Sequence, residues 1–185
     1  MYRTRSLSFR NCIALLLLAG TVAFPSRATA SLKEVGDVLQ FAVPAYAFGY
    51  SLLEKDYDGT KQFLYTLGSS QLTVHVLKMA VDEKRPNYTK GDRKNSFPSG
   101  HTSSAFAGAA FMHRRYGFKS AIVPYGLAII TGYSRVDAKK HHPHDVIVGA
   151  LISCACAWIF TDERNGIVVS SDENMSTKVA YEVSF

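Results

Sequence analysis

Stretches without a charged residue alternate with short polar segments along most of this chain. The uncharged stretches cover residues 38–53, 62–77, 101–112, 120–134 and 146–160. Apolar and polar positions in them do not alternate as they do in a half-buried strand, and each stretch allows several helical turns. The pattern predicts an all-α protein, a bundle of about five to six core helices over residues 31–161.

The last segment, residues 162–185, has a different pattern. Val179, Tyr181 and Val183 alternate with small or polar residues, and Ile167–Val169 is a second short stretch of β-favouring residues. A short C-terminal β-hairpin and a frayed polar tail fit this segment equally well.

The first thirty residues have the features of a cleavable secretory signal. Three arginines precede an uncharged run that ends near residue 24, and the small-x-small sequence Ala28-Thr29-Ala30 follows it. The run is short for a membrane span, although a retained anchor helix is the alternative. We therefore expect a signal peptide over residues 1–30 and export to the periplasm.

The later uncharged stretches leave the protein's relation to a membrane open. Each has about sixteen residues or fewer, whereas a spanning helix needs ~20 apolar residues. They fit the core helices of a globular domain, which their length favours, or short membrane spans around a polar site. Peripheral attachment to a membrane is a third arrangement.

The net charge of the chain argues against nucleic acid as a partner. The full chain has a formal net charge of +6, but its first thirty residues contain four arginines and no acid. Cleavage there leaves 17 basic against 15 acidic residues, a net charge of +2, which is too weak to indicate nucleic-acid binding. Cys154 and Cys156 would point in different directions on a helix, so we expect free thiols rather than a disulfide.

Three polar clusters carry the candidate chemistry, and the first is Lys78 and Arg85, followed by Pro86. Seven residues make about two helical turns, so both cations can lie on one face of a helix that Pro86 ends. Taken alone, this cluster also fits a solvated basic face.

The second cluster is Ser99, Gly100 and His101 at the start of an uncharged stretch. A helix that begins there offers unpaired backbone N–H groups to an anion, and Gly100 permits the close approach of a ligand. The Ser99 hydroxyl adds a donor, and His101 can transfer a proton near neutral pH. An ordinary helix N-cap is the alternative.

The third cluster is Arg135 with His141 and Asp145. Arg135 can hold phosphate oxygens in a two-pronged contact. In a helical turn, the Asp145 carboxylate can bond one nitrogen of His141 and leave the other free to attack. The neighbouring His142 and His144 invite a metal-site interpretation. Adjacent histidines diverge on a helix, however, and no strong zinc spacing is present, so we expect no metal ligands.

Together these clusters resemble the three-part signature of the type 2 phosphatidic acid phosphatase and vanadium haloperoxidase superfamily. The resemblance covers Lys78 to Gly149, and every signature position is filled in order. The matching segments are Lys78-x6-Arg85-Pro86, Pro98-Ser99-Gly100-His101 and Ser134-Arg135-x5-His141-x3-Asp145. His144 departs from the family, where a small polar residue is more common. The helical pattern also fits the all-α bundle of that superfamily.

The resemblance implies a metal-independent phosphatase without a cofactor. It would act on phosphomonoesters or diphosphates, lipid phosphates first among them, through a phospho-histidine intermediate. His141 would attack phosphorus, His101 would protonate the leaving group, and Asp145 would orient His141. The phosphate-binding groups would be Lys78, Arg85, Ser99, Gly100 and Arg135.

Two other functions stay open at this point. A vanadium-dependent haloperoxidase would hold vanadate in the same pocket, although the known haloperoxidases are much larger chains. The second function is that of a binding or structural protein of the cell envelope whose catalytic site has decayed. The intact cationic and imidazole residues argue against it. The expected partners are an anionic phosphate substrate and a membrane surface, and nothing in the sequence indicates an oligomeric state.

Overall fold

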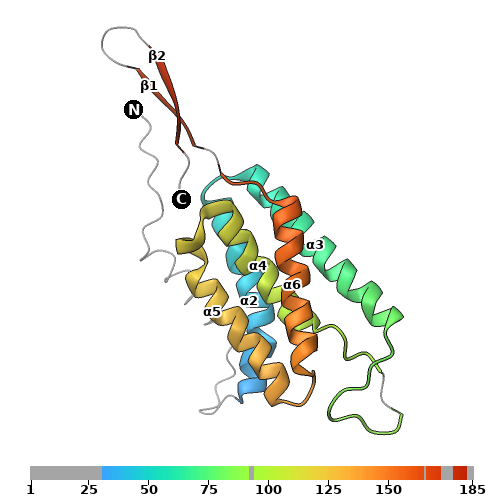
Figure 1. Ribbon diagram of the computed structural model, residues 1–185. Coiled ribbons are helices and arrows are strands. Elements are labelled where there is room, and N and C mark those ends of the chain that lie inside the picture. The colour runs from blue at the N-terminus through green and yellow to red at the C-terminus, as the bar shows by residue number, and fades with distance from the viewer. Residues whose placement is uncertain (1–30, 92–93, 165, 172–176, 183–185) are drawn as a thin grey trace.

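The computed structural model describes residues 31–91, 94–164, 166–171 and 177–182, so the signal peptide expected over residues 1–30 lies outside the described residues. Five helices make up the body of this part of the chain, and they run alongside one another with alternating direction (Figure 1). They are α2 (Leu32–Leu53), α3 (Tyr57–Ala80), α4 (Gly100–Tyr116), α5 (Phe118–Asp137) and α6 (Pro143–Phe160). The all-α prediction is confirmed.

The starts of several helices follow directly from local sequence. Ser31 and Glu34 form a capping box at the start of α2, and the Asp56 side chain accepts from the Gly59 backbone N–H at the start of α3. Such caps satisfy backbone donors that have no partner within the helix. At α6 the first residue is Pro143, whose missing N–H costs nothing there.

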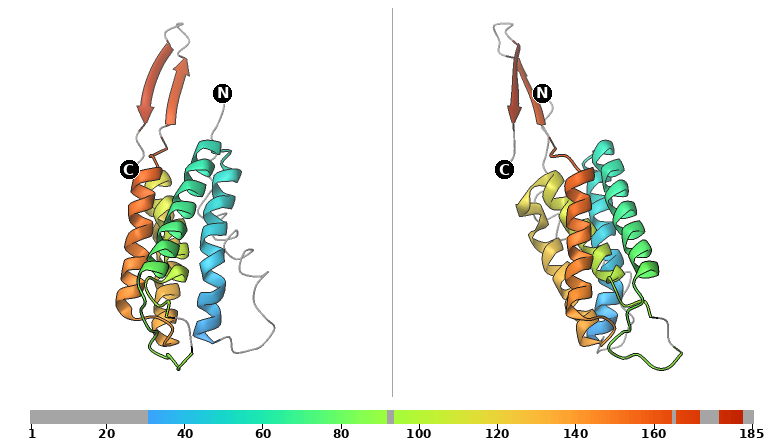
Figure 2. Two further views of the ribbon diagram at one scale, coloured as in Figure 1. Left: turned by 90° about the vertical axis from the view of Figure 1, so that its right-hand side faces the viewer. Right: turned by 45° about the vertical axis from the view of Figure 1, so that its right-hand side comes forward.

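Helix α4 lies at the centre of the bundle and packs against α2, α3, α5 and α6 (Figures 1 and 2). Its alanines 105, 107, 109 and 110 are completely buried. Small side chains allow neighbouring helix backbones to approach closely. At Gly108 an added Cβ would lie 3.0 Å from the backbone of Pro44. The residues of α4 are therefore held between four other helices.

The predicted placement of Lys78 and Arg85 on one helix is wrong. Helix α3 ends at Ala80, and Arg85 lies in the non-helical segment that follows. Pro86 disfavours the helical conformation at the residue before it, and Asp82 and Glu83 would be unfavourable at the negative end of the helix dipole. The chain therefore leaves the helix about one turn earlier than expected.

The C-terminal segment forms the hairpin rather than the frayed tail. Strand β1 (Gly166–Ser171) pairs antiparallel with β2 (Thr177–Glu182). In the register, Ile167 lies opposite Tyr181 and Val169 lies opposite Val179. Residues 172–176 and 183–185 are outside the described part of the chain.

Many large apolar side chains of the helices point away from the bundle. On α3, α5 and α6 the exposed ones include Leu64, Leu72, Met79, Ile122, Ile129, Ile147, Leu151, Trp158 and Ile159. Monomeric soluble proteins rarely expose large contiguous apolar patches. In the described part of the chain, one helix, α6, is long and apolar enough to cross a membrane.

Candidate active site

The alternating direction of the helices brings all three polar clusters to one end of the bundle. The starts of α2, α4 and α6 and the ends of α3 and α5 meet there, at the lower end in Figure 1. A cavity of about 300 Å³ opens between them, and six of the eight predicted site residues line it. Its lining comprises Lys33, Asp37, Lys78, Arg85, Gly100, His101, Arg135, Lys140 and His141. Groups far apart in sequence thus face one small polar space.

His141 and Asp145 form a buried pair at one wall of the cavity. The His141 ring is 4% exposed, and its Nδ1 lies 3.3 Å from Oδ2 of Asp145, which is fully buried. The same oxygen accepts from the Ser96 hydroxyl at 2.5 Å and from the His142 backbone N–H at 2.9 Å. With Nδ1 donating to the carboxylate, Nε2 is the imidazole nitrogen left for chemistry.

The environment of His141 keeps its ring neutral. Burial, followed by the nearby positive charges of Lys78 and Arg85, lowers the pKa of His141 to about 4, against the opposing attraction of Asp145. A neutral imidazole has a free lone pair and is a nucleophile. At neutral pH, burial together with these cations therefore keeps the His141 ring in its reactive form.

The side chains of Lys78 and Arg85 differ in their hydrogen bonds. The Lys78 ammonium donates to the backbone carbonyl of Asn95 at 2.8 Å and to that of Ser96 at 3.3 Å, which fixes it against the loop before α4. The Arg85 Nε is buried and has no hydrogen-bond partner among the described residues. A buried cationic donor without a partner, beside a cavity, suits an anionic ligand that supplies the missing acceptor.

Arg135 and His101 share one carboxylate that the sequence motifs did not reveal. Asp37 Oδ1 accepts from Nη1 of Arg135 at 2.5 Å and lies 3.2 Å from Nε2 of His101. Arg135 is 3% exposed, and it also donates to the Lys33 backbone carbonyl and to the Ser134 hydroxyl. Asp37 comes from α2, which also places Lys33 at the cavity, whereas the signature residues of the site lie beyond residue 77.

Two predicted residues lie behind the cavity wall rather than on it. Ser99 is fully buried as the N-cap of α4, where its hydroxyl accepts from the Thr102 hydroxyl at 2.9 Å and, more weakly, from the Thr102 N–H. Asp145 reaches the cavity only through His141. The Ser99 backbone N–H donates to the Asp145 carbonyl at 2.9 Å, which joins the starts of α4 and α6.

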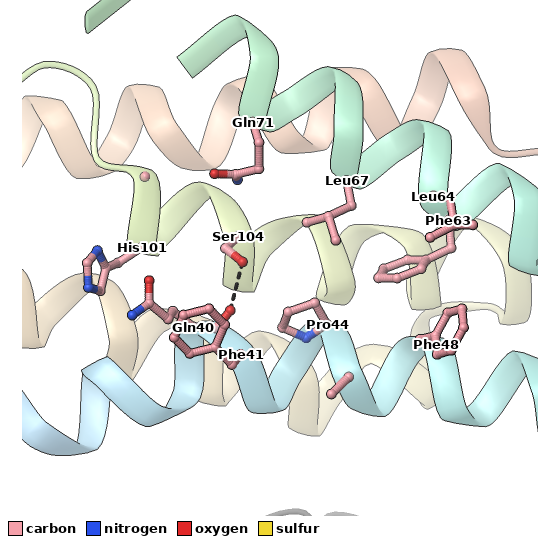
Figure 3. A pocket seen from close by; sticks show the side chains of 12 residues that line it. Gln40, Phe41, Pro44, Phe48, Phe63, Leu64, Leu67, Gln71, His101 and Ser104 are labelled. Atoms are coloured by element: carbon pink, nitrogen blue, oxygen red, sulfur yellow. Dashed lines mark hydrogen bonds between the residues drawn. The ribbon is translucent and has the colours of Figure 1, made fainter. Parts of the chain in front are cut away.

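An apolar groove adjoins the polar cavity. It has a volume of about 720 Å³, and Figure 3 shows it between α2 and α3 with side chains of both helices facing it. Phe41, Pro44 and Phe48 of α2 form one side, and Leu64 and Leu67 are among the residues of the other. Gly100 and His101 line both the groove and the cavity, so the two spaces meet at the start of α4.

Sequence reasoning had little chance of finding some of these features. Asp37, Lys33 and Lys140 line the cavity, but each belongs to a local sequence without a motif. The apolar residues of the groove are ordinary members of uncharged stretches. The one available signal was the position of Asp37 as the last charged residue before the charge-free stretch 38–53.

Comparisons with known proteins identify the family of this chain. Residues 59–165 match the model of the PAP2 superfamily. The chain is 37% identical over 138 residues to the lipid A 4'-phosphatase of Helicobacter pylori strain J99, a match that covers 70% of this chain and 69% of the relative. It is 38% identical over 82 residues to the lipid A 1-phosphatase of Porphyromonas gingivalis, covering 43% of this chain but only 18% of that longer relative.

The fold is also found among solved structures. The crystal structure of Aquifex aeolicus LpxE matches with a TM-score of 0.51 and 24% sequence identity, over 86% of this chain and 98% of that one. The relatives are phosphatases, which favours that activity over a vanadium haloperoxidase. The chain therefore belongs to the PAP2 superfamily and is a phosphoric monoester hydrolase of the lipid phosphate phosphatase type.

Proposed function

We propose that this protein removes the phosphate group from a lipid phosphomonoester. The observation that carries the proposal is the junction of a polar cavity and an apolar groove at Gly100 and His101. An amphiphilic substrate would place its phosphate among the cations and its apolar part between α2 and α3. A small soluble ester would leave the groove empty.

The chemistry would proceed in two steps through His141. Its Nε2 lone pair forms a bond to phosphorus while the bond from phosphorus to the leaving oxygen breaks, and His101 donates a proton to that oxygen. His101 then takes a proton from water as the water oxygen attacks phosphorus, and the phosphorus–nitrogen bond breaks to release inorganic phosphate. Asp145 stabilises the positive charge on the phosphorylated imidazole.

The cations supply the stabilisation that this reaction needs. Charge on the equatorial phosphate oxygens would be held by Lys78, Arg85 and Arg135, with the Gly100 backbone N–H and the positive end of α4 beside them. Ser99 acts here by fixing the first turn of α4 rather than by lining the cavity. Such preorganised donors can stabilise a phosphoryl-transfer state electrostatically.

Lipid A is the first substrate to test. The relative with 37% identity is a lipid A 4'-phosphatase, and a phosphate on a multiply acylated sugar would use both the cavity and the groove. Other lipid phosphates, among them phosphatidic acid, phosphatidylglycerol phosphate and undecaprenyl diphosphate, share the same chemistry. The assay below compares lipid A with phosphatidic acid.

We further propose that the bundle lies in a membrane and that residues 1–30 direct export. The exposed apolar side chains on α3, α5 and α6 would contact acyl chains, and α6 has the length and composition of a span. The site, at one end of the bundle, would then lie near the headgroup level on the periplasmic face. A lipid substrate could reach the groove without leaving the bilayer.

A substrate panel tests the function. The protein in detergent is given lipid A, phosphatidic acid and p-nitrophenyl phosphate, with chelator present, and phosphate release is measured. We expect the lipids to have the higher kcat/KM. A higher value for p-nitrophenyl phosphate would overturn the lipid assignment, and no release from any ester would overturn the activity itself.

A groove variant sharpens this test. Ala45→Trp places a large side chain in the groove from an exposed position, so kcat/KM for the lipids should fall at least tenfold, about 1.4 kcal/mol, with little change for p-nitrophenyl phosphate. Ile129→Trp, on an exposed face of α5 away from the groove, is the matched control. Equal losses for lipid and soluble ester in Ala45→Trp would contradict the proposed role of the groove.

A further inference from the structure

Behind the His141–Asp145 pair lies a second cluster of potential ligand atoms that the proposed reaction does not use. Glu83, His144 and Asp145 each offer one side-chain ligand atom, and these atoms all lie within 4.8 Å of one another. His144 Nε2 is 2.8 Å from Glu83 Oε1 and 3.2 Å from Asp145 Oδ1.

The two oxygens of Asp145 have unequal surroundings. Oδ2 contacts His141, Ser96 and the His142 backbone N–H. Oδ1 is buried and accepts no hydrogen bond among the described residues, although the Nε2 atom of His144 is close. A fully buried carboxylate oxygen without a donor is costly, so a cation at this point would satisfy it.

One ligand spacing in the cluster matches a small tetrahedral cation, and the 2.8 Å between His144 Nε2 and Glu83 Oε1 would lengthen when the ion binds. Two ligands at about 2.0 Å from a tetrahedral zinc ion lie about 3.3 Å apart, close to the 3.2 Å between His144 Nε2 and Asp145 Oδ1. One imidazole and two carboxylates are zinc ligands, and water would complete the shell. His144 is 56% exposed and Glu83 is 27% exposed, so an ion can arrive from solvent.

We propose that Glu83, His144 and Asp145 form an inhibitory Zn²⁺ site behind the catalytic pair. An ion on Oδ1 draws electron density from the Asp145 carboxylate, which weakens the acceptor on which His141 Nδ1 depends. The imidazole is then less nucleophilic, and its phosphorylated form loses the counter-charge. The reaction itself uses no metal, so removing Zn²⁺ restores the full rate.

Binding and activity test the site separately. The full chain in detergent is titrated with Zn²⁺ against a chromophoric chelator, without substrate, at pH 7.5. We expect one site in the unaltered chain and at least about tenfold weaker binding in Glu83→Gln and in His144→Ser. Equal Zn²⁺ affinity in the unaltered chain and both variants, or no binding in the unaltered chain, would overturn the proposal whether or not the protein is a phosphatase.

The activity measurement asks whether the same ion inhibits. With chelator, both variants should hydrolyse substrate within about twofold of the unaltered chain, because neither side chain lines the cavity. With Zn²⁺, half-inhibition should require at least about tenfold more ion in the variants. His75→Ser, an exposed histidine outside the cluster, should keep the original sensitivity. Unchanged zinc sensitivity in His144→Ser would show that inhibition arises elsewhere and sink the proposal.

Discussion

The Asp37 carboxylate lies 2.5 Å from the Arg135 guanidinium, and the same oxygen is 3.2 Å from His101 Nε2. One acid on α2 therefore orients two groups that the proposed reaction needs, although it belongs to none of the signature segments. Its charge favours the protonated form of the His101 imidazole and also stands where a phosphate oxygen would approach Arg135.

Asp37→Asn should separate these two effects. Without the negative charge, phosphate approaches Arg135 more easily, so KM should fall. The protonated imidazole of His101 is less favoured, so kcat should fall and the alkaline limb of the kcat–pH profile should move to lower pH. Lys61→Gln is the control, because Lys61 forms an exposed ion pair with Asp58 at 3.2 Å and does not line the cavity. An unchanged pH profile would leave Asp37 with a structural role only.

Replacement of His141 tests the nucleophile. His141→Asn keeps a polar group near Asp145 but cannot form a stable phospho-imidazole, and kcat should fall by at least about 10³-fold. The thermal unfolding profile shows whether the variant is folded. Brief exposure of the unaltered chain to labelled substrate should leave acid-labile phosphate on the protein, and the variant should carry none. Retained activity in the folded variant would refute the mechanism.

The titration of His141 gives a prediction about stability. Its folded pKa of about 4 lies below the usual value of about 6.5 for an unfolded chain. Between those values the unfolded state takes up a proton that the folded state does not, so the free energy of unfolding should fall as pH drops from 6.5 to 4. His141→Asn should remove part of this slope. Ring NMR signals that titrate near pH 6.5 would contradict the prediction.

At Gly149, α6 lies in tight contact with the start of α4. A Cβ there would lie 2.6 Å from the Ser99 carbonyl oxygen, which is backbone and cannot rotate away. Gly149→Ala should therefore cost about 1–3 kcal/mol and lower activity by displacing the first turn of α4. Gly126 on α5 has nothing within 4 Å of an added Cβ, so Gly126→Ala should cost nothing. Equal melting temperatures for the two variants would refute this account.

The helical architecture could be predicted because the uncharged stretches coincide with single helices. The stretch 146–160 lies within α6, and Pro143 and Asp145 occupy its first turn as their residue types favour. The convergence of Lys78, Arg135 and His141 was expected from the resemblance, and the structure places all three on one cavity. The roles of these residues stay predictions.

Other features depend on tertiary packing, and local sequence patterns give little indication of them. The pairing of Asp37 with Arg135 spans 98 residues, and Asp37 is one of two acids in the first turns of α2. The groove exists because α2 and α3 leave space beside α4, which no local pattern encodes. The seven-residue spacing of Lys78 and Arg85 predicted one helix for both. Helix α3 instead ends at Ala80, because Pro86 disfavours the helical conformation at the residue before it and the acids Asp82 and Glu83 are unfavourable at the end of a helix.

The walls of the groove come mainly from α2 and α3, whereas the signature residues from Gly100 onward lie on or beside α4, α5 and α6. Recognition of the organic part of a substrate would thus depend mainly on α2 and α3, whereas the two imidazoles that act on its ester bond come from the start of α4 and the segment before α6. Substitutions on the groove faces of α2 and α3 can alter which molecules are accepted without touching the reactive groups. The bundle is a scaffold on which new specificities can arise while the chemistry stays the same.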